Sequence, residues 1–224
     1  MDHFREELQE LNDKLLEMSS LVESSIALSV DAVINRNKDA IATVFRKESD
    51  INRLELQIDE ISLRLLALQQ PVAVDLRFVM MSIKINNNLE RMGDIAQNIS
   101  QYAAILIETP EPAPRIDIPH MAKLAQNMIK DSLDAFVRRD VELARKVLMS
   151  DDEVDAMRDR MYSDIRKYME EAPSLVNPGL EYLFIARGLE RLADHATNIA
   201  EDVLFFVQGV DVRHNADAAG LPTA

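Results

Sequence analysis

The apolar residues of this chain recur at spacings of three and four along most of its length, which is the pattern of helices that pack in a bundle. In the first half, three such stripes follow one another, at positions 8–29, 44–68 and 89–106. Asn37 and Asp75 are the predicted N-caps of the second and third helices, and Pro71 is predicted to end the second. The pattern therefore predicts three long antiparallel helices over residues 1–108.

A proline-rich segment, residues 109–118, separates this half from the second. Prolines cannot continue a helix, so the segment is predicted to be a stiff, extended linker. Beyond it the spacing predicts a second unit over 119–210, with Asp140 as the N-cap of its middle helix. Its three helices are expected at 119–138, 140–170 and 179–208. Residues 211–224 are polar and are expected to form a frayed tail.

The two halves repeat one another. Residues 89–99 and 189–199 are identical at seven of eleven positions, at an offset of 100 residues. The preceding helices of each half align at an offset of 103, which pairs Glu48 with Asp151. The chain holds only 5 glycines and 8 prolines, which favours long helices over turn-rich strands. We therefore expect an all-α protein made by duplication, with two tandem three-helix bundles and six long helices.

Each copy of the repeat carries two acids one helical turn apart on its third helix. These are Glu90 and Asp94 in the first copy and Glu190 and Asp194 in the second. Side chains four residues apart share one face of a helix, so each pair can present two carboxylates to one cation. The face that carries Glu90 and Asp94 lies away from the apolar stripe and is richer in amides than in lysine or arginine. The spacing therefore favours binding of a cation once per half.

Further oxygen ligands lie on the second helix of each half and farther along the third. On the second helices the candidates are Glu48, Glu55 and Asp59 in the first copy, and Asp151 and Asp155 in the second. Farther along the third helices they are Asn98, Asn198 and Glu201. If the second and third helices are neighbours, each half gathers several oxygens. Such a set selects Mg²⁺, Mn²⁺ or iron, as one ion or several, over Zn²⁺ or copper.

A plainer interpretation of these acids stays open. Acids on a helix usually form a solvated or ion-paired surface, and Arg91 and Arg191 stand beside the two pairs. Retention of both acids in two copies that have otherwise diverged puts metal binding on an even footing with that interpretation. His195 has no counterpart, because Ile95 holds its place in the first copy. We expect it to pack or to face solvent rather than to bind metal.

Composition and charge exclude several classes of function. A net charge of -14 and a pI near 4.7 repel phosphates and anionic lipids, so neither nucleic-acid binding nor direct lipid binding is expected. The lack of cysteine excludes disulfides and thiolate metal sites. No apolar run is long enough to cross a membrane and the first residues do not resemble a signal peptide, so a cytoplasmic location is expected.

Sequence signatures of catalysis are sparse. The chain has no Gly-rich phosphate loop, no Gly-x-Ser-x-Gly and no His-Glu-x-x-His, so we do not expect an enzyme. The leading interpretation is a binding protein. The alternatives are a metal-dependent enzyme or metal-handling helical bundle that uses the same acids, and a structural helical scaffold.

Three features together resemble the PhoU family. They are the duplicated Glu-Arg-x-x-Asp segments at 90–94 and 190–194, the junction from Pro71 to Asp75-Leu76-Arg77, and the closing run 205–214. The resemblance covers residues 1–214. It implies paired three-helix bundles, often a homodimer, in the bacterial cytoplasm, held near the inner membrane by protein partners. It also implies an adaptor that links the ATPase-driven phosphate ABC transporter to a sensor histidine kinase and represses the phosphate regulon.

The resemblance also implies metal binding at acid-x-x-x-acid motifs. In this sequence they fall on Glu90 with Asp94, on Glu190 with Asp194, and on Asp151 with Asp155. The chain departs from the pattern at two places. After Glu48 the second acid is replaced by Asn52, and Ala193 stands where the first copy has the more typical Gly93.

Overall fold

The computed structural model describes residues 2–109 and 116–209, and every regular element within them is helical. The first half holds α1 (Asp2–Ile34), α2 (Lys38–Arg64) and α3 (Ala73–Ile107). The second half holds α4 (Ile118–Arg138), α5 (Val141–Met149), α6 (Asp151–Glu171) and α7 (Val176–Gln208). The all-α prediction is confirmed. Most of the predicted linker, 110–115, and the predicted tail, 211–224, lie outside the described residues.

Two of the predicted N-caps are confirmed by their hydrogen bonds. The Asn37 side-chain oxygen accepts from the backbone N–H groups of Asp39 and Ala40, at 3.1 and 3.2 Å. The Asp140 carboxylate accepts from the N–H of Leu143 at 3.0 Å. Each bond satisfies donors that a helix leaves unpaired in its first turn, and such caps contribute about 1 kcal/mol each.

The predicted cap at Asp75 is wrong. Helix α3 begins two residues earlier, at Ala73, after the extended residue Val72. Asp75 lies within the first turn, where a negative charge still favours the positive end of the helix dipole. Before this junction the chain leaves α2 through a π-helical turn, Leu65–Gln69, and Gln70 is left-handed with φ 47°. The second helix therefore ends before Pro71, as predicted.

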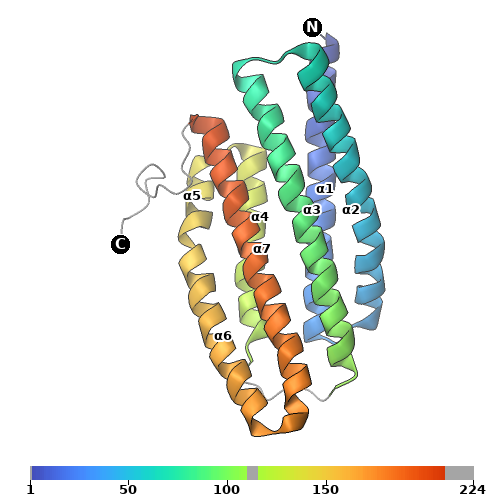
Figure 1. Ribbon diagram of the computed structural model, residues 1–224. Helices are drawn as coiled ribbons and strands as arrows, with labels where there is room; N and C mark the ends of the chain where they lie inside the picture. The colour runs from blue at the N-terminus through green and yellow to red at the C-terminus, as the bar shows by residue number, and fades with distance from the viewer. Residues whose placement is uncertain (1, 110–115, 210–224) are drawn as a thin grey trace.

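The middle helix of the second half, predicted as one element over 140–170, is broken at Ser150. The Ser150 N–H bonds the carbonyl of Val147 at 3.0 Å, which closes a tighter turn than the α-helical one. Helices α5 and α6 still follow one another along one edge of the molecule (Figure 1). The last helix begins at Val176, three residues before the predicted start.

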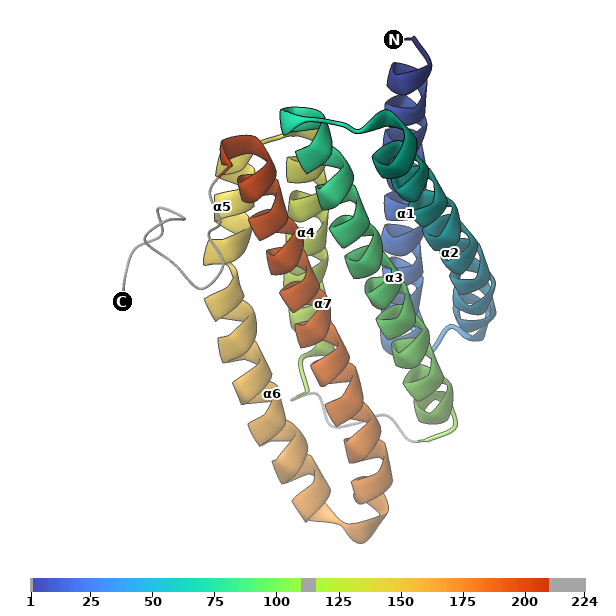
Figure 2. The same cartoon turned by 45° about the horizontal axis from the view of Figure 1, so that its top comes forward.

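The helices form a central group of four with a cover on each side. Helix α3 packs against both α1 and α7, and α4 packs against α7 and α1. Helix α2 covers α1 and α3, while α5 and α6 lie against α7 and α4 at the opposite edge (Figures 1 and 2). The two halves therefore meet along α3 and α7, which run antiparallel and side by side in both views.

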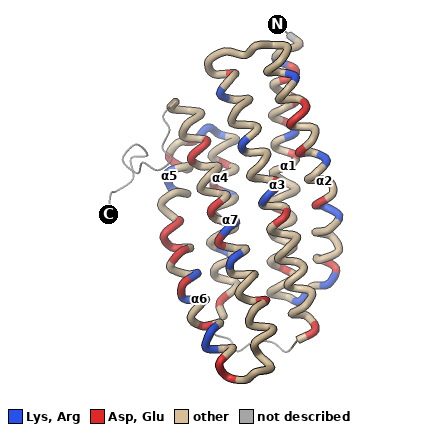
Figure 3. Tube along the Cα trace, in the orientation of Figure 1, with Lys and Arg blue, Asp and Glu red and all other residues tan. Residues whose placement is uncertain are grey.

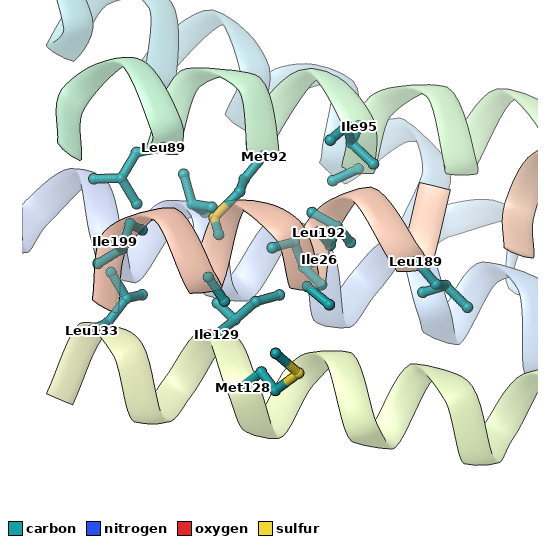
Figure 4. Close-up of a cluster of buried hydrophobic side chains, with 14 of the residues drawn as sticks. Ile26, Leu89, Met92, Ile95, Met128, Ile129, Leu133, Leu189, Leu192 and Ile199 are labelled. Carbon is teal, nitrogen blue, oxygen red and sulfur yellow. The ribbon is translucent and has the colours of Figure 1, made fainter. Parts of the chain in front are cut away.

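One continuous core joins the two three-helix units. Its buried side chains come from α1, α3, α4 and α7 together, as Figure 4 shows for Ile26, Met92, Ile129 and Leu192. Burying each such side chain contributes about 1.5–3 kcal/mol. The apolar stripe predicted on the third helix, which includes Leu89, is fully buried here. The sequence-predicted bundles thus share their core rather than standing as separate bodies.

Candidate acidic sites on the third helices

The acid pairs of α3 and α7 lie outside the core, each on the side that meets its own second helix. Helix α2 packs against α3, and α6 packs against α7. Glu90 and Glu190 are partly buried, whereas Asp94 and Asp194 are exposed. Each pair is therefore positioned at a seam between two helices, and acids on the neighbouring helix decide its electrostatics.

In the first half, α2 and α3 bring four carboxyl groups together. Burial raises the pKa of Glu90, and the charges of Asp94 and Glu55 raise it further. Burial also raises the pKa of Glu55, followed by the charges of Asp59 and Asp94. Nearby negative charges disfavour ionisation of a carboxyl group, so Glu55 and Glu90 feel the acids of both helices; Figure 3 shows acidic positions on α2 and α3. We refer to Glu55, Asp59, Glu90 and Asp94 as the first acidic cluster.

A buried amide lies beside the first acidic cluster. Asn86, only 1% exposed, donates to the Asp59 carboxylate at 3.0 Å and to the backbone carbonyl of Glu55 at 3.1 Å. Its own side-chain oxygen is buried and has no hydrogen-bond partner. An unpartnered buried acceptor costs about 1–3 kcal/mol. The candidate Glu48 lies nearer the start of α2, where its carboxylate accepts a hydrogen bond from Asn52.

In the second half, α6 and α7 bring together Asp151, Asp155, Glu190 and Asp194, which we refer to as the second acidic cluster. Burial raises the pKa of Asp194 to about 6, with further contributions from Glu190, Asp151 and Asp155. Burial likewise raises the pKa of Asp151. The two clusters thus share the pattern of repelling carboxyl groups across a helix–helix seam.

The second acidic cluster differs from the first because it contains an arginine. One guanidinium nitrogen of Arg158 lies 2.7 Å from Asp155 and 3.0 Å from Glu190, so it bridges α6 to α7. The other terminal nitrogen lies 3.1 Å from Asp159. The Arg158 side chain is 24% exposed, so solvent screens these pairs only in part. The positive charge offsets part of the repulsion among the acids.

The repeat shows which residue of the first half corresponds to Arg158. At the 103-residue offset its counterpart is Glu55, and the counterpart of Asp59 is Tyr162. At the 100-residue offset the counterpart of Asn86 is Ala186. The second half therefore has an arginine and a tyrosine where the first has two acids. Comparison of the two copies along the whole second helix reveals this difference in the sequence, whereas the retained acids alone do not.

The clusters are not arranged as closed metal sites. Within residues 2–109 and 116–209, no three acidic or histidine side chains converge so that they could hold a metal ion. The donors of the first acidic cluster, carboxylates with the spare oxygen of Asn86, still suit a hard cation by their chemistry. The second acidic cluster suits a metal cation less well, because the positively charged guanidinium of Arg158 already lies among its acids.

The remaining candidates lie at the contact between α3 and α7. Asn98 lines one pocket there, and Asn198 and Glu201 line another. His195 is half-buried, with its Nδ1 2.9 Å from the amide oxygen of Asn88. Burial lowers the pKa of His195 to about 4, and the positive charges of Arg191 and Arg91 lower it further. It is therefore neutral at pH 7 and contacts α3 through Asn88, and the expectation that it does not bind metal stays a prediction.

The family model for the PhoU domain matches the chain twice, at residues 15–103 and at residues 118–203. The chain belongs to the PhoU family. This confirms the resemblance inferred from the duplicated acidic segments. The two PhoU domains correspond to the two halves that meet along α3 and α7.

Curated PhoU relatives match almost the whole chain. A protein of Pseudomonas putida is 37% identical over 94% of this chain and 83% of its own length. A protein of Caulobacter vibrioides is 37% identical over 93% of this chain and 91% of its own length. Both are named as phosphate-specific transport system accessory protein PhoU homologs.

Solved PhoU structures share the fold. The crystal structure of PhoU from Pseudomonas aeruginosa has a TM-score of 0.89 and 35% identity, over 92% of this chain and 100% of that one. The phosphate transport system regulatory protein PhoU from Streptococcus pneumoniae has a TM-score of 0.84 and 29% identity, over 93% and 99% of the two chains.

In the part of the chain that the structure describes, no helix is both long enough and apolar enough to cross a membrane.

Proposed function

We propose that this chain is a non-catalytic regulator of phosphate transport and of the response to phosphate starvation. The observation that carries the proposal is the pair of PhoU domains, which together span most of the chain and match relatives named as accessory proteins of phosphate-specific transport. In the finer form of the proposal, the protein is a cytoplasmic adaptor. It contacts the ATPase of the phosphate ABC transporter and a sensor histidine kinase, and it keeps the phosphate regulon silent while phosphate is plentiful.

The surface of the molecule supports association through proteins rather than through lipid. A net charge of -14 opposes binding to anionic headgroups. Helix α2 exposes Leu56 and Leu63, which are 69% and 65% accessible, and apolar side chains of this kind favour protein contacts. Two related domains in one chain can engage two partners at once, so that weak contacts reinforce one another. A homodimer, which we also propose, would double that valence.

Deletion of the gene is expected to switch phosphate-starvation genes on in phosphate-rich medium, because the repressing adaptor is lost. A starvation-responsive reporter measures this directly. In a second assay, the purified protein should cosediment with membranes that contain the transporter or its kinase and should ignore bare anionic liposomes. Unchanged reporter expression in the deletion strain would refute the assignment, and equal binding to bare liposomes would refute association through proteins.

We further propose that divalent or ferric ions bind at the two acidic clusters. In the first half, no three acids converge on one point within the described residues, so Glu55, Asp59, Glu90 and Asp94 would draw together around the ion. Asn86 would supply a neutral oxygen, and Glu48 on α2 is a further candidate ligand. In the second half, the ion would compete with the guanidinium of Arg158 for the carboxylates of Asp151, Asp155, Glu190 and Asp194. The ion would supply positive charge that neutralises the repelling carboxylates and ties the second helix of a half to its third.

Added Mn²⁺ is expected to raise the melting temperature of protein purified without chelator, because a ligand that binds only the folded state stabilises it. The double variant E90Q/D94N should lose most of this increase. A variant changed at the exposed acids Glu17 and Glu60 serves as a matched control and should keep it. An unchanged melting temperature, together with metal-free elemental analysis, would leave the acids as an ordinary charged surface.

A further inference from the structure

Two pockets lie along the contact between α3 and α7, at positions that the repeat relates to one another. We refer to this contact, with one pocket toward each end, as the groove. The helices run antiparallel, so each position on α3 has its counterpart 100 residues later at the opposite end of the groove. One end is lined by residues that include Lys84, Asn87, Asn88, Asn198 and Asp202. The other is lined by their counterparts, Phe184, Arg187, Gly188, Asn98 and Tyr102. Each residue that differs between the two ends therefore differs between two positions that are equivalent in the repeat.

An ion pair bridges the first end of the groove, and an aromatic pair occupies the equivalent place at the second. The Lys84 ammonium lies 2.6 Å from the Asp202 carboxylate and so joins α3 to α7. At the second end the same two positions hold Phe184 and Tyr102, whose rings stack with centroids 5.2 Å apart and planes 27° apart. The second end thus replaces a charge contact by an apolar, flat surface.

Two arginines line the second end, whereas its lining includes no acid. Arg187 takes the place of Asn87, and Arg191 follows one helical turn later on α7. Within the described residues neither guanidinium makes an ion pair, although the chain as a whole is strongly acidic. Like charges four residues apart destabilise an isolated helix by about 0.2–0.5 kcal/mol. The fold therefore holds two uncompensated donors side by side at the mouth of a pocket.

The other lining residues determine the size and the polarity of this pocket. Its volume is about 310 Å³, which is at the lower limit for small-molecule sites. Gly188 belongs to the lining, and a Cβ atom there would stand only 3.0 Å from Ile99, so the absence of a side chain lets α7 approach α3 closely. Asn98 and Tyr102 add an amide donor and a hydroxyl donor. Phe184 keeps 41% of its surface exposed.

We propose that this pocket binds a small organic anion in which a phosphate or carboxylate group is attached to a flat ring. The forked guanidinium groups of Arg187 and Arg191 suit the oxyanion, because arginine donates to such groups in a bidentate manner. The exposed face of Phe184 suits the ring. A bare inorganic oxyanion would leave that aromatic face uncovered. The site is distinct from the acidic clusters and does not depend on the proposed role in phosphate signalling.

Calorimetric titration with adenosine monophosphate, adenosine and inorganic phosphate tests the proposal on the full chain. Adenosine monophosphate is expected to bind, inorganic phosphate to bind at least about tenfold more weakly, and adenosine to bind more weakly still, since only the first probe carries both groups. R187Q/R191Q should weaken adenosine monophosphate binding by at least about tenfold. F184A should reduce its advantage over inorganic phosphate.

Arg46→Gln supplies the matched control, because Arg46 is an exposed arginine on α2 that lies outside the pocket. It should bind like the unchanged protein. Equal weakening by R46Q and R187Q/R191Q would mean that only overall charge matters, and lack of adenosine monophosphate binding would refute the site itself. Equal affinity for inorganic phosphate and adenosine monophosphate would refute the role given to Phe184. Circular dichroism of each variant verifies that it is folded.

Discussion

Arg158→Glu is expected to lower the free energy of unfolding by about 2–3 kcal/mol. The substitution removes the bridge from α6 to Asp155 and Glu190 and puts a further carboxylate among four that already repel one another. The estimate lies below that for a fully buried pair because the side chain is 24% exposed. Urea unfolding followed by circular dichroism measures it. Added Mn²⁺ should recover part of the loss, since it restores positive charge.

The reciprocal change, Glu55→Arg, is the matched control for Arg158→Glu. It gives the first acidic cluster the residue that the second already has at the equivalent position. We expect it to be neutral or stabilising, because the charges of neighbouring acids raise the pKa of Glu55. A loss below about 0.5 kcal/mol in Arg158→Glu would place these ion pairs among ordinary surface contacts.

Leu192→Ala is expected to destabilise the protein by about 2–5 kcal/mol, because it leaves a cavity in a fully buried position. Leu192 belongs to the core that α1, α3, α4 and α7 share (Figure 4). The whole chain should therefore unfold in one transition at a lower denaturant concentration, including the half that carries no substitution. Fluorescence or circular dichroism, combined with hydrogen exchange in each half, tests this.

Leu56→Ala serves as the control for the core substitution, since Leu56 is 69% exposed and its truncation should cost no more than about 0.5 kcal/mol. If Leu192→Ala instead produced two transitions, with the first half unfolding at its original midpoint, the halves would be independent bodies and the shared core would be energetically unimportant.

The helices could be predicted from the sequence because their signals are local. Spacings of three and four place the apolar stripe on one face, and the side chains of Asn37 and Asp140 cap helices within three residues of themselves. The break at Ser150 could not be predicted, because no proline or glycine marks it. The shared core was also missed. An apolar stripe shows which face is buried but not which neighbour covers it.

The sequence indicates which acids share a helix face but not what surrounds them, and metal binding at these acids stays a prediction. Glu90, Asp94, Glu190 and Asp194 lie at helix seams with other candidate acids, as the spacing implied. The role of Arg158 depends on a contact to Glu190, 32 residues away on another helix. The unpartnered oxygen of Asn86 likewise depends on how α2 lies against α3. Such tertiary contacts cannot be inferred from the sequence, because neither produces a periodic pattern in it.

The antiparallel pairing of α3 with α7 relates the two halves as the subunits of a symmetric dimer are related, with the same surface used on both sides. A single repeat would offer that surface to a second copy of itself, so the present chain has the architecture of a homodimer fused into one gene. Fusion makes the assembly independent of protein concentration. It also frees the two copies to mutate separately, as a symmetric dimer cannot. Glu55 against Arg158, and the Lys84–Asp202 ion pair against the Phe184–Tyr102 stack, record that divergence.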